Sequence, residues 1–316
     1  MKEWFKYGDK YTVDGLLKRW HDTKYRDWYL GDWLAPMGVD AGNQASVDLV
    51  SNCFISECLS TMYKTALTLG NKEEAEEFAI RREKLNKLIH QTFYRADEGI
   101  YSTGSQLDMC YPMLVGVVPD SLYNKVKENV VMMTEEKHKG HFAVGLVGVP
   151  ILTEWAVRNK QVDFFYQMMK KRDYPGYLYM IDHGATATWE YWSGERSRVH
   201  NCYNGIGTWF YQAVGGIRLD EAKPGYRHFY VDPQIPNGVT WAKVTKESPY
   251  GTIAVNWKLK DDNQLNLQLT VPAGTTATVC IPNNAVSCKK NKKKVSVKER
   301  TVDVEAGHYD FLFNLK

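Results

Sequence analysis

The fold is decided by two consecutive segments, Ser46–Leu69 (SVDLVSNCFISECLSTMYKTALTL) and Lys72–Phe93 (KEEAEEFAIRREKLNKLIHQTF). In both, apolar residues recur mainly at steps of three and four, the spacing that places them on one face of a helix. Gly70 and Asn71 end the first segment, and acidic residues occupy the first turn of the second. Because the turn between them is short, the two segments are predicted to form an antiparallel helical hairpin.

Further helical segments follow this hairpin, and strands follow the helices. The predicted helices are 106–117, 120–136, 142–158, 161–171 and 201–214. After Pro224 and Gly225 the pattern changes to a period of two, which is typical of half-buried strands. The predicted strands are 252–259, 264–271, 277–281, 295–298 and 309–314. The sequence therefore predicts a helical domain over residues 1–220 and a β-sandwich over residues 221–316.

Length and composition agree with two globular domains. The chain has 316 residues, of which 44% are apolar and 24% charged, so disordered and fibrous classes are excluded. No apolar run approaches the ~18 residues of a membrane span, and the first ten residues lack the apolar stretch of a signal peptide. We expect a soluble chain with no membrane partner. Its compartment is left open, since secretion or the periplasm would suit a longer parent protein.

The charge is uneven along the chain. Residues 225–316 hold 13 Lys and Arg against 8 Asp and Glu, and the excess lies largely in the lysine run 289–294. A solvated hairpin loop explains this run better than nucleic-acid binding, so no nucleic-acid partner is expected. The six cysteines include no Cys-x-x-Cys pair. We therefore expect no structural zinc site and interpret the cysteines as free, mostly buried thiols.

Two loop clusters combine indoles, carboxylates and glycines outside any helical period. They are residues 28–33 (WYLGDW) and 182–192 (DHGATATWEYW). Indole faces stack on the C–H face of a pyranose while carboxylates accept hydrogen bonds from its hydroxyls, so the clusters indicate a carbohydrate pocket. Core packing between helices is the alternative for any single tryptophan. Glu190 is the leading catalytic candidate, because a glutamate beside two indoles is costly to bury without a function.

Other possible sites are weaker. His200 opens the last predicted helix and is either a core imidazole or a group that binds sugar hydroxyls. The pair His138 and His141 has no acidic or cysteine partner in order, so it indicates a loop at the end of a helix rather than a metal site. The sequence contains no P-loop, nucleophile elbow or His-Glu-x-x-His motif.

These residues give the sequence a resemblance to a known family. The run 173–190 (DYPGYLYMIDHGATATWE) and the later His200-Asn201 resemble the α-L-rhamnosidases of glycoside hydrolase family 78. Residues 31–36 (GDWLAP) are similar to the Gly-Asp-Trp loop of that family, and residues 145–150 (GLVGVP) to its following helix start. Residues 240–251 are similar to the C-terminal sandwich of the family. The resemblance runs in order over nearly the whole chain.

The resemblance implies an (α/α)₆ toroid followed by a small antiparallel β-sandwich. It also implies inverting hydrolysis of terminal, non-reducing α-L-rhamnose residues from glycans or glycosides. In such a reaction one carboxylic acid protonates the leaving oxygen, and a carboxylate about 6.5–9.5 Å away activates water. By this resemblance, Glu190 occupies the position of the family's general base. The expected substrate-binding residues are Asp32, Trp33, Asp182, Trp189, Trp192 and His200. No metal or cofactor is expected, because carboxylates and water suffice.

One family motif has no counterpart here. The general acid of the family lies in an Asp-x-x-x-x-Glu-Arg-x-Gly-Trp segment, which does not occur in this sequence. The predicted helices are also too few for six helical pairs. We therefore expect a toroid that is incomplete at its N-terminus, with low activity by itself and with Asp32 and Asp182 as candidates for a substitute acid. The expected partners are a rhamnose-containing carbohydrate and either the missing N-terminal segment or a second copy of the chain.

Two other functions stay open at this point. The first is a non-catalytic carbohydrate-binding protein that kept the aromatic pocket of such an enzyme. The second is a polysaccharide lyase, which is disfavoured because the acidic groups near Glu190 would repel a uronate.

Overall fold

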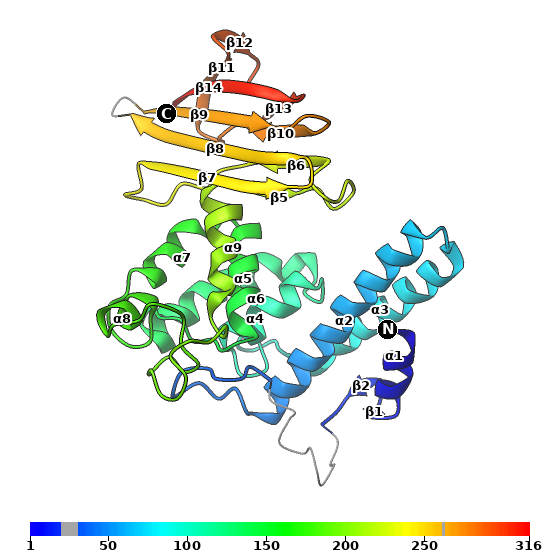
Figure 1. Cartoon of the computed structure of the whole chain (residues 1–316). Coiled ribbons are helices and arrows are strands. Elements are labelled where there is room, and N and C mark those ends of the chain that lie inside the picture. The colour runs from blue at the N-terminus through cyan, green and yellow to red at the C-terminus, as the bar shows by residue number, and fades with distance from the viewer. Residues whose placement is uncertain (20–30, 261–262) are drawn as a thin grey trace. The chain divides into compact units, whose positions relative to one another are not determined.

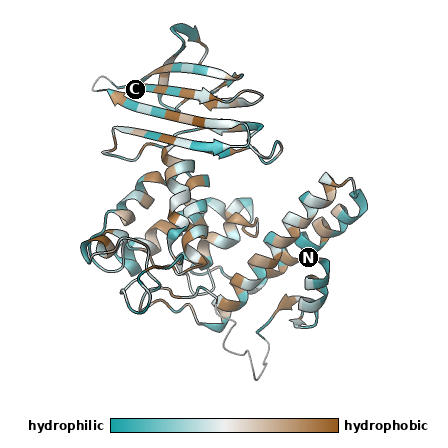
Figure 2. Cartoon of the chain, viewed as in Figure 1, coloured by the Kyte–Doolittle hydropathy of each residue, from teal (hydrophilic) through white to brown (hydrophobic). Residues whose placement is uncertain are grey.

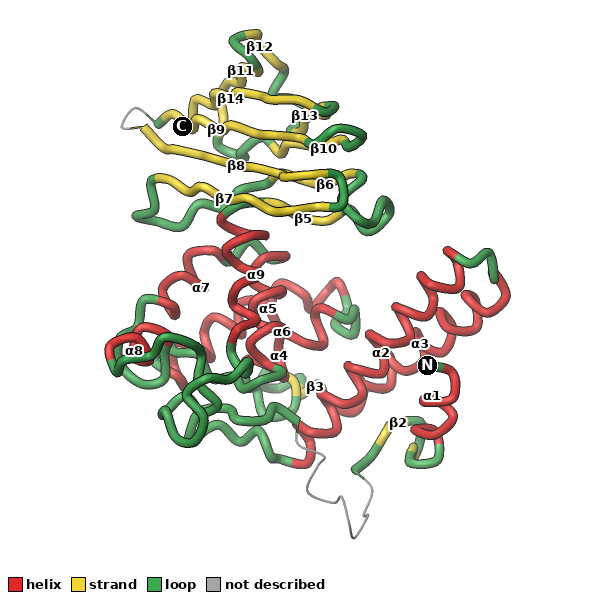
Figure 3. The backbone as a smooth tube through the Cα atoms, in the orientation of Figure 1, coloured by secondary structure: helices red, strands yellow, loops and turns green. Residues whose placement is uncertain are grey.

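The computed structural model describes residues 1–19, 31–260 and 263–316. Helices dominate the chain up to Val214 and strands dominate it from Ile217 onward (Figure 3). The chain separates into two compact units. The first unit holds residues 1–155 and 167–205, and the second holds residues 156–166 and 206–316.

The first unit is mainly helical (Figure 1). Its elements are α1 (Lys2–Asp9), β1 (Thr12–Val13), β2 (Leu16–Leu17), α2 (Gln44–Thr68), α3 (Lys72–Phe93), β3 (Tyr94–Arg95), β4 (Ile100–Tyr101), α4 (Gln106–Leu114), α5 (Asp120–His138) and α8 (Tyr177–Asp182). Two further helices, α6 (Gly148–Arg158) and α7 (Val162–Met169), have residues in both units. The hairpin of α2 and α3 is confirmed, and α3 has the predicted bounds.

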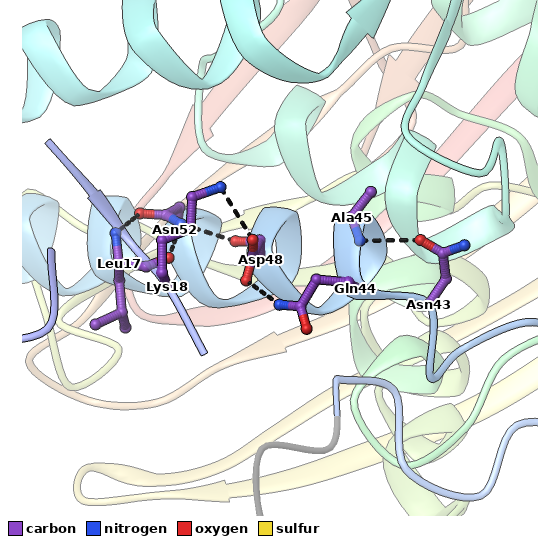
Figure 4. Close-up of polar contacts among 7 residues, drawn as sticks. All are labelled: Leu17, Lys18, Asn43, Gln44, Ala45, Asp48 and Asn52. Atoms are coloured by element: carbon purple, nitrogen blue, oxygen red, sulfur yellow. Dashed lines mark hydrogen bonds and ion pairs between the residues drawn. The ribbon is translucent and has the colours of Figure 1, made fainter. Parts of the chain in front are cut away.

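The start of α2 is fixed by side-chain hydrogen bonds (Figure 4). The Asn43 carboxamide accepts from the N–H of Ala45 (2.9 Å) and so caps the helix. About two turns further along the helix, the Asn52 side chain accepts from the N–H of Leu17 and donates to its carbonyl, both at 2.9 Å. The amide of Asn52 thus pairs with β2 as another strand would. Asp48 adds an ion pair to Lys18 at 3.0 Å.

Some predicted helices are shorter or broken in the structure. Residues 142–147 are irregular and only α6 forms from the predicted helix 142–158, because backbone N–H groups of this stretch bind a side chain described below. The predicted helix 201–214 is divided into turns, η2 (Asn204–Ile206), α9 (Gly207–Trp209) and the π-helical η3 (Phe210–Val214). Gly205 and Gly207 weaken a regular helix there. The sequence analysis missed α1 and α8, which are short.

The second unit contains two β-sheets. Its strands are β5 (Ile217–Leu219), β6 (His228–Val231), β7 (Trp241–Ser248), β8 (Gly251–Lys260), β9 (Gln264–Val271), β10 (Thr276–Cys280), β11 (Ala285–Lys290), β12 (Lys293–Val295), β13 (Thr301–Val304) and β14 (Gly307–Leu315). One sheet has the order β13-β10-β6-β5 and the other β12-β11-β14-β9-β8-β7. All pairs are antiparallel as predicted except β6 with β10, which are parallel. These two strands are joined through β7–β9 in the other sheet, so no tight turn imposes an antiparallel pairing.

Alternation along the strands creates the core of the second unit (Figure 2). On β8 the inward residues Ile253, Val255 and Trp257 are buried, and the Trp257 indole N–H donates to the Val214 carbonyl at 2.7 Å. The lysine run lies in the β11–β12 hairpin, but not in its loop as predicted: four of the five lysines are strand residues, and only Lys292 lies in the turn. The predicted strand 295–298 is instead mostly a turn between β12 and β13. The six cysteines are free, and four of them are buried.

Candidate active site

Asp32, the central residue of the Gly-Asp-Trp loop, is buried, with 4% of its surface exposed. Its Oδ2 accepts from the N–H of Gly145 and its Oδ1 from the N–H of Gly148, both at 2.7 Å. Since Gly148 is the first residue of α6, the carboxyl group sits at the N-terminus of that helix. Burial raises the pKa of Asp32 to about 7, although the N–H donors of Gly145 and Gly148 oppose the rise.

The sequence of the helix start follows from this contact. A Cβ atom at Gly148 would lie 2.6 Å from Oδ2 of Asp32, and one at Gly145 would collide with the Trp33 carbonyl. Only glycine allows the carboxyl group and the backbone to approach so closely. Residues 145–150 are therefore a helix start built around Asp32, and this confirms the helix start that was predicted there.

Trp33 of the first loop cluster and His200, which follows the second cluster in the sequence, meet in the structure. Their rings lie edge to face with centroids 6.3 Å apart. Trp33 is 36% exposed, so part of its indole is open to a ligand. The Nδ1 atom of His200 accepts from the N–H of Cys202 at 3.1 Å. A neutral His200 ring therefore carries its proton on Nε2, which can donate to an incoming hydroxyl.

Glu190 is half-buried in the second loop cluster. Its N–H donates to the carbonyl of Ser197 at 2.9 Å, and its Oε2 accepts from the N–H of Ser197 at 3.3 Å. Both bonds close the loop between the two residues and fix the orientation of the carboxylate. Burial and the charge of Glu190 raise the pKa of Cys202 to about 11, so this neighbouring thiol is not a nucleophile at neutral pH.

Tyr203 joins the two clusters, and the sequence analysis missed it. Its hydroxyl lies 2.8 Å from the Leu34 carbonyl and 3.1 Å from the Glu190 carbonyl, within hydrogen-bond distance of both. Its ring stacks on Trp192 with centroids 4.1 Å apart, and the residue is fully buried. Burial raises the pKa of Tyr203 well above its ordinary value, so the hydroxyl stays a donor. The sequence predicted a regular helix over residues 201–214, and this prediction gave no indication of the role of Tyr203.

The two other tryptophans of the second cluster are buried. The Trp192 indole N–H donates to the Val144 carbonyl at 2.8 Å, and its ring stacks on Phe142. Trp189 lies under the Arg198 guanidinium, 5.2 Å from the ring centroid, and beside Gly194. In this conformation both indoles support the loop that carries Glu190, and neither offers an open face to a sugar.

Asp182 is the last residue of α8 and its side chain is partly exposed. Both of its oxygens accept from Nη1 of Arg172, at 2.5 and 2.8 Å. Among the described hydrogen bonds of the Tyr203 hydroxyl, none is to Asp182. Trp28, Tyr29 and Leu30 of the first cluster lie outside the described residues.

The structure also bears on metal binding and on membrane spans. His141 pairs with Asp173 at 3.2 Å and follows the end of α5, as expected of a loop at a helix end. Within the described ranges, no group of three or more His, Cys, Asp or Glu residues is arranged to hold a metal ion. None of the helices in these ranges has the length and apolar character needed to cross a membrane.

Comparison with known proteins decides the family. Residues 1–214 match the model of the bacterial α-L-rhamnosidase six-hairpin glycosidase domain. The chain belongs to this family. Residues 216–296 match the bacterial α-L-rhamnosidase C-terminal domain. The resemblance inferred from residues 31–36 and 173–190 is thus confirmed, and so is the predicted combination of a six-hairpin domain with a C-terminal β domain.

Members of the α-L-rhamnosidase family with related sequences are known from several bacteria. A protein of Alteromonas sp. (strain LOR) named α-L-rhamnosidase is 26% identical, in a match covering 98% of this chain and 34% of that protein. One from Formosa agariphila with the same name is 28% identical, with 94% of this chain and 35% of that protein covered. The chain therefore spans about a third of the length of these relatives.

Solved structures of α-L-rhamnosidases share the fold. The Streptomyces avermitilis enzyme, solved in complex with L-rhamnose, superimposes with a TM-score of 0.85 at 22% identity, covering 98% of this chain and 30% of that one. The enzyme named as from Dictyoglumus thermophilum gives a TM-score of 0.87 at 20% identity, covering 99% and 36%. At these identities the likeness establishes the fold.

Proposed function

We propose that the chain carries the base side of an inverting α-L-rhamnosidase, with Glu190 as the general base. Its membership of the α-L-rhamnosidase family and the names of its relatives support this reaction. The observation that carries the proposal is the contact of the Tyr203 hydroxyl with Leu34 and Glu190. This contact links the backbone that follows Trp33 to the loop that carries Glu190, which supports a shared site for a small, hydroxyl-rich ligand.

The roles follow from the chemistry of the side chains. The Glu190 carboxylate takes a proton from water while the water oxygen attacks the anomeric carbon, on the face opposite the leaving oxygen. The exposed part of Trp33 stacks on the sugar, and His200 donates from Nε2 to a hydroxyl. The ligand is a terminal α-L-rhamnose residue, the sugar named with the Streptomyces avermitilis structure. The leaving oxygen receives its proton from an acid outside the residues assigned here.

The remaining predicted site residues receive different roles in this proposal. Asp32, Trp189 and Trp192 are positioning residues, because they are buried and hold the loops that present Trp33 and Glu190. Asp182 stays a substrate contact, oriented by Arg172 through its partly exposed carboxylate. We also propose that the functional domains are residues 1–220 and 221–316. Limited proteolysis tests this boundary, because a cut near residue 220 would yield two resistant fragments.

Hydrolysis of p-nitrophenyl α-L-rhamnopyranoside tests the proposed reaction. The p-nitrophenolate group leaves without protonation, so the assay reports on the base even where the acid is weak. Glu190→Gln should abolish turnover while L-rhamnose binding, measured by calorimetry, persists. Glu195→Gln, an exposed glutamate of the same loop, is the matched control and should keep both. Binding of L-rhamnose without turnover, even after the N-terminal part of a longer α-L-rhamnosidase is supplied, would instead support a non-catalytic binding protein.

A further inference from the structure

One face of the six-stranded sheet in the second unit has features that the proposed hydrolysis does not use. Trp241, Lys258, Asn266, Leu312 and Lys289 lie opposite one another on the consecutive strands β7, β8, β9, β14 and β11. Directly opposed residues share a face of the sheet, so these five side chains form one row. Because strands lie about 4.8 Å apart, the row spans about 19 Å. We call it and its neighbours the outer sheet face.

A second row runs beside the first and is rich in polar groups. Lys243, Asn256, Gln268 and Asp310 oppose one another on β7, β8, β9 and β14. The Gln268 carboxamide donates to Asp310 at 3.1 Å. Residues of both rows line a hollow of 690 Å³. This volume lies within the range of about 300–1,000 Å³ that ligand sites occupy.

The groups in and beside this hollow are those that bind sugars. Trp241 does not line the hollow, but it is 64% exposed and lies opposite Lys258, which does, so a large apolar ring faces solvent next to it. Carboxamides both donate to and accept from hydroxyls. The Oδ1 atom of Asn256 is buried and has no hydrogen-bond partner among the described residues. An acceptor of this kind is stabilised by a hydroxyl donor.

The charge of the face defines the ligand further. Lys258 and Lys289 are exposed in the first row, Lys292 is exposed at the edge of the hollow, and Asp310 is the one acidic residue among those lining it in the described structure. The hollow therefore has an excess of positive charge, which favours an anionic ligand. Phosphate groups accept hydrogen bonds but do not donate them, so they would leave the unpartnered Oδ1 of Asn256 without a donor. Sugar hydroxyls can donate to it.

We propose that the outer sheet face is a binding site for a carboxylated polysaccharide. Trp241 stacks on a sugar ring, the carboxamides of Asn266 and Gln268 bind hydroxyls, and Lys258 and Lys289 bind the carboxylates. The length of the row suits several consecutive sugar residues rather than a single one. Such a site would keep the chain on a polymer that carries its substrate, and it rests on residues separate from those around Glu190.

The test measures binding of the full 316-residue chain to oligogalacturonate by calorimetry, with neutral dextran and single-stranded DNA as comparison ligands. Two variants probe the site, Trp241→Ala and the double variant Lys258→Glu/Lys289→Glu. Lys298→Glu is the control, because it reverses the charge of one exposed lysine that does not line the hollow. All the substituted side chains are exposed, so melting temperatures should stay unchanged and should verify folding.

The expected result is that oligogalacturonate binds and dextran binds more weakly. Each site variant should weaken binding about tenfold or more, and Lys298→Glu should leave it unchanged. The absence of oligogalacturonate binding would overturn the proposal. Binding that depends on Lys258 and Lys289 but not on Trp241, with DNA bound equally well, would also overturn it, because this result describes an unspecific cationic surface. The measurement is independent of hydrolysis.

Discussion

The buried carboxyl group of Asp32 should make the stability of the protein depend on pH in a characteristic way. Burial raises its pKa in the folded protein to about 7, whereas an unfolded aspartate has a value of about 3.9. Between these values the folded state binds more protons than the unfolded state. The contribution of Asp32 to the free energy of unfolding is therefore complete below pH 4 and is lost as the pH rises toward 7.

The magnitude follows from the size of the pKa shift. A shift of about three units at about 1.4 kcal/mol each gives a loss of about 4 kcal/mol across this pH range. Asp32→Asn removes the titration and turns one amide N–H₂ toward a backbone N–H of Gly145 or Gly148. This mismatch should destabilise the protein by about 1–3 kcal/mol at low pH. The variant should therefore be less stable than the unmodified protein at pH 4.5, and the difference should shrink or reverse by pH 8.

Urea unfolding followed by tryptophan fluorescence at several pH values measures both profiles. Asp40→Asn, an exposed aspartate in the loop leading to α2, is the control and should follow the unmodified protein at every pH. Parallel profiles for Asp32→Asn and the unmodified protein would refute the argument. A difference that grows with pH would also refute it, because it would show that the two N–H donors outweigh burial and keep Asp32 charged.

Three further predictions concern the elements that hold the site. Asn52→Ala should destabilise the protein by about 3 kcal/mol in a thermal or urea melt, because the N–H and carbonyl of Leu17 lose their partners; an unchanged melt would contradict this role. Gly148→Ala should cost more than about 2 kcal/mol in the same melt, since its Cβ would lie 2.6 Å from Asp32, while Gly42→Ala, where the added Cβ meets no atom within 4 Å, should change it by less than about 0.5 kcal/mol. Tyr203→Phe should destabilise by about 1–2 kcal/mol and weaken L-rhamnose binding in calorimetry, and equal affinity in the variant would show that the hydroxyl does not position the loops.

Local patterns in the sequence were sufficient to predict the long helices and strands. The periodicity of residues 46–69 and 72–93 predicted α2 and α3, and the alternation of residues 252–271 predicted β8 and β9. The edge-to-face contact of Trp33 with His200 brings together two of the residues that the sequence singled out. These features depend on neighbours in sequence or on motifs of the family.

Contacts between distant residues could not be predicted in the same way. Asp32 was expected to face a sugar, but the glycines more than a hundred positions later capture its carboxyl group at the start of α6. Trp192 stood in a loop segment, yet the stack with Phe142 and Tyr203 buries it. Tyr203 itself carried no signal, because its role depends on where Leu34 and Glu190 lie in space. The strand β11 was not predicted because its burial does not alternate regularly and it ends in two lysines.

The assignment of Glu190 as general base is tested most directly by chemical rescue. In Glu190→Ala, azide can occupy the space of the lost carboxylate and attack the anomeric carbon of p-nitrophenyl α-L-rhamnopyranoside without a base. If Glu190 is the base, azide should restore release of p-nitrophenol and NMR should show β-L-rhamnosyl azide, the product of a single inversion. Full activity of Glu190→Ala without azide, or a rhamnosyl azide of the α configuration, would contradict it.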